Sequence, residues 1–230
     1  MGNILQLANV SKIYGTKIKT QVLNEFNLEI EEGSFNSIIG QSGSGKSTLL
    51  NIIGTLDVPT QGEVIINGIS TQKLTKKQLA TLRNQTLGFI FQFHYLLPEF
   101  TVLENILMPY RMQNKKVTPE VMERALHLID VVGLSKVKNN LATNLSGGQQ
   151  QRTAIARALM NQPKIILADE PTGNLDSDTT DQIYDLMRSI NQSMNTTFLI
   201  ITHDQSVAER TDRIIEIKDG KIILDVHKKP

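Results

Sequence analysis

Residues 40–47 read Gly40-Gln41-Ser42-Gly43-Ser44-Gly45-Lys46-Ser47, three glycines within six positions followed at once by Lys and Ser. The residues before this loop, 34–39, have the composition of a short strand, and Lys46–Ile53 after it has the apolar spacing of a helix. Glycines permit positive φ angles and close backbone approach, so successive N–H groups can surround a phosphate at the helix N-terminus. The stretch therefore predicts a phosphate-binding loop at a strand-to-helix junction, and with it an α/β fold.

The loop matches the Walker A pattern, which assigns Lys46 to the β- and γ-phosphates of a nucleotide and the Ser47 hydroxyl to Mg²⁺. A flexible Ser/Gly loop is the alternative, but such a loop requires neither the Lys-Ser pair nor the flanking strand and helix. The predicted nucleotide contacts are Gly40, Gln41, Ser42, Gly43, Ser44, Gly45, Lys46, Ser47 and Thr48.

Short apolar strands alternate with helical patterns on both sides of the loop, which is typical of a largely parallel sheet. From residue 93 to 161 the apolar positions follow a helical period, and Thr118 and Pro119 mark one helix start. We therefore expect a single domain, with a core of residues 1–92 and 162–230 and a helical subdomain of residues 93–161. The other strands are expected at residues 4–10, 26–30, 63–66, 87–91, 165–168, 197–202, 213–217 and 221–226.

Composition and charge exclude several classes of protein. The 230 residues carry 24 Lys and Arg against 23 Asp and Glu, so no net positive field attracts nucleic acid, and we expect no nucleic-acid partner. The chain has no Cys, which excludes a disulfide framework and a Cys-ligated zinc site. It lacks an apolar run of the ~20 residues that span a bilayer and lacks a secretory leader pattern, so we expect a soluble, cytoplasmic chain.

Two adjacent carboxylates, Asp169 and Glu170, close the apolar strand at residues 165–168. Neighbouring residues of a strand point to opposite faces, so we expect Asp169 near Mg²⁺ and Glu170 polarising an attacking water. A solvated strand end with two surface acids is the alternative. His203 follows the strand at 197–202, and its spacing alone favours a structural or exposed histidine. If that strand lies beside the strand of Asp169, His203 could instead contact the γ-phosphate.

Residues 145–152, Leu-Ser-Gly-Gly-Gln-Gln-Gln-Arg, resemble the signature motif of ATP-binding-cassette ATPases and open a helix expected at residues 149–160. A Ser/Gly helix cap would explain Ser146 but not the whole octet. In that family the motif faces the γ-phosphate held by a second subunit, so the resemblance implies an ATP-dependent homodimer around two ATP molecules. The implied contacts are Ser146, Gly147, Gly148 and Gln149.

The resemblance covers essentially the entire chain and implies further roles. Tyr14 resembles the aromatic residue that stacks on adenine, although by itself it could be a core residue. Gln92 resembles the Q-loop glutamine that contacts Mg²⁺, Asp176 lies in a stretch similar to the D-loop at the dimer interface, and His203 occupies the switch-histidine position. The implied activity is hydrolysis of ATP with Mg²⁺, in which the catalytic residues are Glu170, His203 and Gln92 and the metal ligands are Ser47, Gln92 and Asp169. The implied fold is a P-loop NTPase core with a mixed, largely parallel sheet, an N-terminal antiparallel β portion and an inserted helical subdomain.

Residues 96–105 and 168–176 resemble one branch in particular, the ATPases of macrolide-exporter, lipoprotein-release, peptide-antibiotic-export and cell-division systems; Gln149 stands where that branch more often has Glu. This implies a subunit peripheral at the inner face of the cell membrane, which drives export or lipoprotein or peptide extrusion by separate transmembrane permease subunits. A regulatory ATPase that signals to cell-wall or division machinery stays open as an alternative, and a DNA- or ribosome-acting cassette protein as a minor one.

The stretch after Gln92 is predicted to form the docking groove for the membrane subunit. It contains five apolar residues within eight positions, while Pro98 and Glu99 break any regular helical period. Hydrophobic patches on soluble subunits commonly mark such interfaces, although the core of the helical subdomain is the alternative. The five residues are Phe93, Tyr95, Leu96, Leu97 and Phe100.

Overall fold

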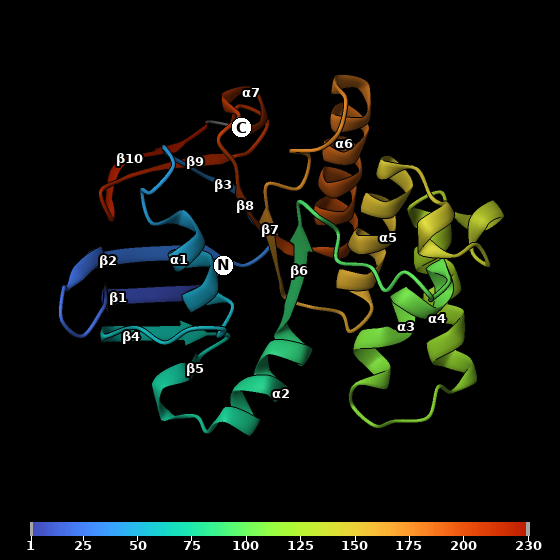
Figure 1. The fold of residues 1–230 in the computed structure, drawn as a ribbon, viewed down its shortest axis with the longest axis horizontal. Coiled ribbons are helices and arrows are strands. Elements are labelled where there is room, and N and C mark those ends of the chain that lie inside the picture. The colour runs from blue at the N-terminus through green and yellow to red at the C-terminus, as the bar shows by residue number, and fades with distance from the viewer. Residues whose placement is uncertain (1, 229–230) are drawn as a thin grey trace.

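Two β-sheets organise the computed structural model, which describes residues 2–228 (Figure 1). The first is antiparallel, with the strand order β2-β1-β4-β5. The second has six strands in the order β10-β9-β3-β8-β7-β6, and all of its pairs are parallel except β10 with β9. The predicted α/β architecture with a mixed, largely parallel sheet and an N-terminal antiparallel portion is thereby confirmed. The strands are β1 (Asn3–Tyr14), β2 (Thr20–Glu31), β3 (Phe35–Ile39), β4 (Gln61–Ile66), β5 (Ile69–Ser70), β6 (Leu87–Phe91), β7 (Ile165–Asp169), β8 (Thr197–Ile201), β9 (Arg213–Lys218) and β10 (Lys221–His227).

The helices cover both faces of the six-stranded sheet, and α3, α4 and α5 gather at the end of the molecule away from the antiparallel sheet (Figure 1). None of the described helices has the length and apolar character needed to cross a membrane. The α-helices are α1 (Lys46–Ile53), α2 (Lys76–Thr86), α3 (Val102–Arg111), α4 (Pro119–Val131), α5 (Gly147–Leu159), α6 (Ser177–Met194) and α7 (Gln205–Ala208), and three 3₁₀ turns lie at Thr71–Lys73, Ser135–Val137 and Ala142–Asn144.

The local chemistry of the sequence explains many element boundaries. The helix after the glycine loop spans Lys46–Ile53 as predicted, and α4 has Thr118 as its cap and Pro119 in its first turn. The strands predicted at residues 4–10 and 26–30 lie within β1 and β2, but the predicted ranges are too short. Each observed strand has twelve residues. One face of an antiparallel sheet can be exposed to solvent, so polar residues alternate with buried ones along β2. Because of this alternation, only a short apolar part of β2 was recognised as a strand.

The prediction of almost continuous helix from 93 to 161 is wrong directly after β6. Residues 92–100 form turns and irregular structure instead. The side-chain amide of the fully buried Asn105 forms hydrogen bonds with backbone groups of this segment. It accepts from the Leu97 N–H and donates to the Leu97 and Phe100 carbonyls. One internal side chain therefore supplies the hydrogen bonds that a helix would otherwise provide.

The apolar residues after Gln92 are mostly exposed. Phe93, Tyr95 and Leu97 expose 66%, 62% and 38% of their surfaces, so the alternative that they form part of the helical core is wrong for these three. Leu96 is partly buried and packs against the core, and Phe100 is partly buried. The segment thus presents a surface of large apolar side chains.

The core consists of two apolar clusters on opposite faces of the six-stranded sheet. In β8, Phe198 and Ile200 belong to the cluster shared with α3–α6, whereas Leu199 and Ile201 belong to the cluster shared with α1 and the antiparallel sheet. This alternation is the two-residue period of a strand, and both faces are covered, so the strand is a continuous apolar run. Because β3, β6, β7 and β8 are parallel, the residues that follow them meet at one edge.

We expect Phe198→Ala to reduce the free energy of unfolding by about 3–5 kcal/mol, the usual cost of removing a buried phenyl ring. Phe93→Ala is the matched control, since Phe93 is 66% exposed while Phe198 is fully buried. The measurement is urea denaturation of both variants beside the parent protein. Equal losses of stability in the two variants would contradict the assignment of β8 to the core.

Candidate functional site

A cavity of about 650 Å³ lies at the edge where the parallel strands end, and it brings together residues that are distant in the sequence. The glycine loop and α1 supply one side, and the residues that end or follow β6, β7 and β8 supply the other. Predicted residues from all four segments thus share one space. The lining residues are Val22, Ser42, Gly43, Gly45, Lys46, Ser47, Thr48, Gln92, Asp169, Glu170, Ile201 and His203.

The glycines are needed for the shape of the loop. Gly45, at φ 105°, is the cap of α1 and provides no side-chain hydrogen bond to the helix. A Cβ added at Gly40 would lie 2.2 Å from the Ile217 carbonyl oxygen, so no larger residue fits there. The first N–H groups of α1 are consequently directed at the cavity without a side-chain cap, which is the arrangement that binds anions at helix N-termini.

Lys46 lies at the centre of this loop. Its ammonium group donates to the carbonyls of Gly40 and Gln41 at 2.6 and 2.9 Å, and it lies 3.5 Å from the hydroxyl of the buried Ser44. Burial lowers the pKa of Lys46, and the two carboxylates across the cavity oppose that effect. The cation is therefore held by neutral carbonyls, which phosphate oxygens can replace with charge-assisted hydrogen bonds.

The two carboxylates at the end of β7 have different surroundings. Burial raises the pKa of Asp169, the charge of Glu170 raises it further, and Lys46 acts in the opposite direction. Glu170 has a left-handed backbone at φ 45°, and its carboxylate oxygens contact His203 Nδ1 at 2.7 Å and the Thr202 hydroxyl at 3.3 Å. Since β8 pairs directly with β7, the residues after β8 fix the direction of the Glu170 side chain.

The oxygen ligands in the cavity fit a hard divalent cation such as Mg²⁺. Gln92, whose amide donates to Asn174 Oδ1 at 3.1 Å, lines the same cavity as Ser47 and Asp169. Hydroxyl, amide and carboxylate oxygens are suitable Mg²⁺ ligands. Within residues 2–228 no group of three or more His, Cys, Asp or Glu residues could hold a metal ion alone. The residues thus fit an ion that arrives with phosphate and takes only a few ligands from the protein.

The signature residues lie outside this cavity. Ser146 caps α5: its hydroxyl accepts from the Gln149 N–H at 3.3 Å, and the Gln149 side chain accepts from the Ser146 N–H at 3.0 Å. Gly147 and Gly148 form the first turn of this helix, and Asp176 caps α6. None of these five residues is among the described residues that line the cavity.

Tyr14 also lies outside the lining of the cavity. Its hydroxyl donates to Asp57 Oδ2 at 2.7 Å, and Lys12 Nζ lies 4.7 Å from the centre of its ring. Because 40% of its surface is exposed, the alternative that Tyr14 is a core residue is wrong. Val22, in contrast, lines the cavity although nothing in the sequence singled it out. Thr202 was also missed, and its position directly before His203 was the one available signal.

Comparisons with known proteins found similarities over most of the chain. A family model described as "ABC transporter" matches residues 23–173. The lipoprotein-releasing system ATP-binding protein LolD 1 of Rhodopseudomonas palustris is 49% identical over 224 residues, 96% of this chain and 99% of that protein. LolD of Anaeromyxobacter dehalogenans is 48% identical over 222 residues, 96% of this chain and 93% of its own length.

Solved structures resemble the chain over 98% of its length. A dimeric structure of the ATP-binding cassette MJ0796, in a post-hydrolysis state bound to ADP and Pi, has a TM-score of 0.88 at 43% identity, with 99% of that chain covered. CbiO1 from Clostridium perfringens, part of the ABC transporter complex CbiONQ, has the same TM-score at 26% identity, with 88% of its chain covered. Both similarities extend over the core sheets and the helices.

We expect Lys46→Met to weaken nucleotide binding about 10- to 100-fold, the loss associated with one hydrogen bond to a charged group. The measurement is titration of the purified chain with a fluorescent ATP analogue. Lys164→Met is the matched control, because Lys164 is exposed and pairs with Glu32 far from the cavity. Unchanged affinity in Lys46→Met would mean that the loop does not hold phosphate.

Proposed function

The chain belongs to the ABC transporter family of ATPases, and we propose that it is the nucleotide-binding subunit of a membrane complex whose spanning subunits are separate chains. The observation that carries this proposal is the cavity in which the phosphate loop faces Asp169 and Glu170 at the end of β7. The LolD relatives support the release of lipoprotein, or the export of a similar lipidated or peptide substrate, as the task of the complex. Such a subunit would lie at the inner face of the cell membrane.

The proposed mechanism is in-line attack of water on the γ-phosphate of ATP. Glu170 orients the water, and its carboxylate is held for this task by His203 and Thr202. Lys46 exchanges the carbonyls of its own loop for phosphate oxygens and stabilises the charge of the transferring group. Mg²⁺, bound by Ser47, Gln92 and Asp169, would supply additional charge neutralisation.

We propose that the chain forms an ATP-dependent homodimer, and the position of the signature residues supports this. Ser146 is exposed, and the start of α5 is not part of the cavity of its own chain, so a contact between Ser146 and nucleotide requires a second chain. The first N–H groups of α5 and the partial positive charge of the helix N-terminus suit a γ-phosphate. The dimeric MJ0796 cassettes support this arrangement, in which Ser146, Gly147, Gly148 and Gln149 contact the partner's ATP and Asp176 lies at the interface. Tyr14 would stack on the adenine.

We expect Glu170→Gln to bind ATP normally but to lose most of its turnover, at least about 100-fold, because the amide keeps the shape of the side chain and lacks its basicity. Phosphate release and gel filtration with and without MgATP are the measurements, and a stable ATP-bound dimer is expected. Asp178→Asn is the control, since Asp178 lies in the first turn of α6 and not in the cavity. Near-normal hydrolysis by Glu170→Gln would refute the role of Glu170.

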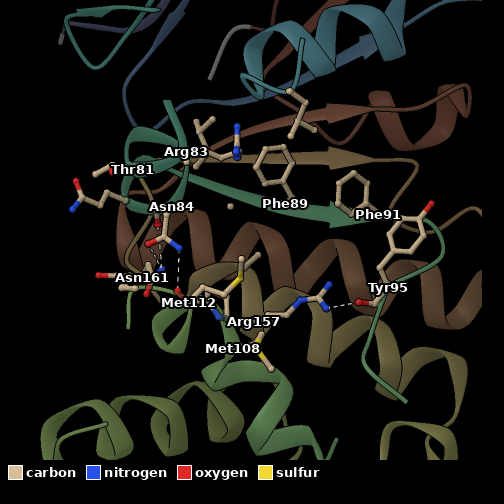
Figure 2. A pocket seen from close by; sticks show the side chains of 18 of the residues that line it. Thr81, Arg83, Asn84, Phe89, Phe91, Tyr95, Met108, Met112, Arg157 and Asn161 are labelled. Atoms are coloured by element: carbon tan, nitrogen blue, oxygen red, sulfur yellow. Dashed lines mark hydrogen bonds between the residues drawn. The ribbon is translucent and has the colours of Figure 1, made fainter. Parts of the chain in front are cut away.

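A groove of about 780 Å³, shown in Figure 2, is the candidate docking surface for the membrane subunit. Residues of α2, β6, α3 and α5 surround it, so the helical subdomain proposed for residues 93–161 forms one of its walls. Phe89 stacks on Phe91 with ring centres 5.8 Å apart, and Tyr95 meets Phe91 edge-on at 5.3 Å. These rings form an apolar wall of the kind that anchors protein interfaces.

The charges in this groove indicate the chemistry of its partner. Lys77, Arg83, Lys115 and Arg157 line it, and no acidic residue is among its described lining residues. None of the four cations forms an ion pair within residues 2–228. The groove thus combines an aromatic wall with unneutralised positive charge. We propose that it accepts an amphipathic segment of the spanning subunit, with apolar residues toward the rings and acidic residues toward the cations.

We expect Tyr95→Ala and Lys115→Glu to impair co-purification with the spanning subunits while the ATPase activity of the isolated chain stays within about twofold, because rim charges and aromatic anchors act mainly on association. Lys221→Glu is the control for the charge change, since Lys221 is exposed on β10 and does not line the groove. A sharp fall in the thermal transition of Tyr95→Ala would instead identify Tyr95 as a structural residue, and the docking surface would be rejected.

A further inference from the structure

A buried glutamine of α5 connects the groove to the catalytic end of β7. Gln151 is fully buried, and its Nε2 donates to the Pro171 carbonyl at 2.5 Å. Its Oε1 faces Nδ1 of His94, which is itself buried. Pro171 directly follows Glu170, and His94 directly precedes the groove residue Tyr95. One side chain therefore contacts two segments that the sequence separates widely.

The hydrogen-bonding capacity of these groups fixes their orientation. A peptide carbonyl only accepts hydrogen bonds, so the nitrogen of the Gln151 amide must face Pro171 and the oxygen must face His94. The proton of the neutral imidazole must then be on Nδ1 of His94. The three groups form a directed chain in which His94 donates to Gln151 and Gln151 donates to Pro171.

Arg157 attaches the same helix to the same turn. Its guanidinium donates to the Tyr95 and His94 carbonyls, each at 2.6 Å. Figure 2 shows this guanidinium directed at the backbone of Tyr95. His94 and Tyr95 both have left-handed backbones, at φ 59° and 47°, which is a costly conformation for residues other than glycine. The turn is held in this conformation from α5, by Arg157 at the backbone and by Gln151 at the imidazole.

Glu170, near the other end of this series of hydrogen bonds, also has a strained backbone. Its φ of 45° also lies in the left-handed region, and strained residues persist only where their surroundings fix them. On one side the Glu170 N–H donates to the Ile201 carbonyl at 2.9 Å. On the other side the carbonyl of the next residue, Pro171, is the one that Gln151 holds. These two anchors hold the backbone on either side of Glu170, from which the side chain reaches His203 and Thr202.

We propose that Gln151, oriented by His94, is a positioning residue that sets the direction of Glu170 and couples it to the turn bordering the groove. A partner that displaces Tyr95 would act through His94 and Gln151 on the Pro171 carbonyl, one residue after Glu170. This inference rests on the role proposed for Glu170. The pair has no place in the nucleotide cavity, since neither residue is among its described lining residues.

The test compares variants that remove hydrogen bonds of this chain of contacts: His94→Leu removes the one between His94 and Gln151, and Gln151→Met removes that one and the one to Pro171. Both variants keep the approximate shape of the side chain; His94→Leu should lower kcat for ATP about five- to tenfold, the kinetic equivalent of one lost hydrogen bond, and Gln151→Met should lower it at least as much. The KM for ATP and the affinity for a fluorescent ATP analogue should not change. His94→Asn places an N–H donor where Nδ1 lies and should restore kcat to within about twofold of the parent protein.

Thr153→Val is the matched control, because it removes a buried hydrogen bond from the same helix without touching His94 or Pro171. It should leave kcat unchanged. All rates are measured well below each variant's thermal transition. Unchanged kcat in both His94→Leu and Gln151→Met would overturn the proposal, and so would a loss of kcat in His94→Asn or Thr153→Val as large as the loss in His94→Leu. If Gln151→Met does not fold, the comparison of His94→Leu with His94→Asn decides the question alone.

Glu170→Gln, measured in parallel, distinguishes a failure of the role proposed for Glu170 from a failure of the positioning role proposed for Gln151. If Glu170→Gln hydrolyses ATP normally, the proposed role of Glu170 fails, and the positioning role fails with it. If Glu170→Gln is inactive while Gln151→Met and His94→Leu turn over at the parent rate, only the positioning role fails.

Discussion

The parallel pairing of β3, β8, β7 and β6 is the constraint on which the site depends. Parallel strands end at one edge, so segments that the sequence separates by more than a hundred residues are delivered to the same space. Both faces of β7 and β8 are packed, and these strands cannot shift without exposing core residues to solvent. The rigidity of the sheet permits the strained backbone at Glu170, because the surrounding packing opposes its relaxation.

Local chemistry allowed much of this to be predicted from the sequence. The glycine loop and α1 have strong short-range signals, as does the buried strand β6, and each was predicted with the correct bounds or nearly so. Signals were weaker in β1 and β2, where one face is solvated, and both strands were predicted too short. The helix α6 was missed although its buried residues follow a helical spacing. The turn after β6 could not be predicted, because its stability comes from the buried amide of Asn105 and not from its own residues.

The pair of His94 and Gln151 shows where prediction from one sequence ends. The two residues are 57 positions apart, and neither has a local pattern that marks a contact. The groove is a similar case, because its four cations come from α2, α5 and the residues after α3, and only the fold gathers them. Individual motifs can be recognised in the sequence, whereas the contacts between them depend on tertiary packing.

The capping box at the start of α5 has a consequence for assembly. Ser146 and Gln149 satisfy each other's backbone N–H groups, and glutamate at position 149 would do so equally well. Glutamate, however, would add a full negative charge beside a helix end that carries about half a positive charge. The amide preserves that field, which reaches about 10 Å at 0.1 M salt. In the proposed dimer, each α5 N-terminus therefore faces the partner's ATP without a carboxylate that would repel the γ-phosphate.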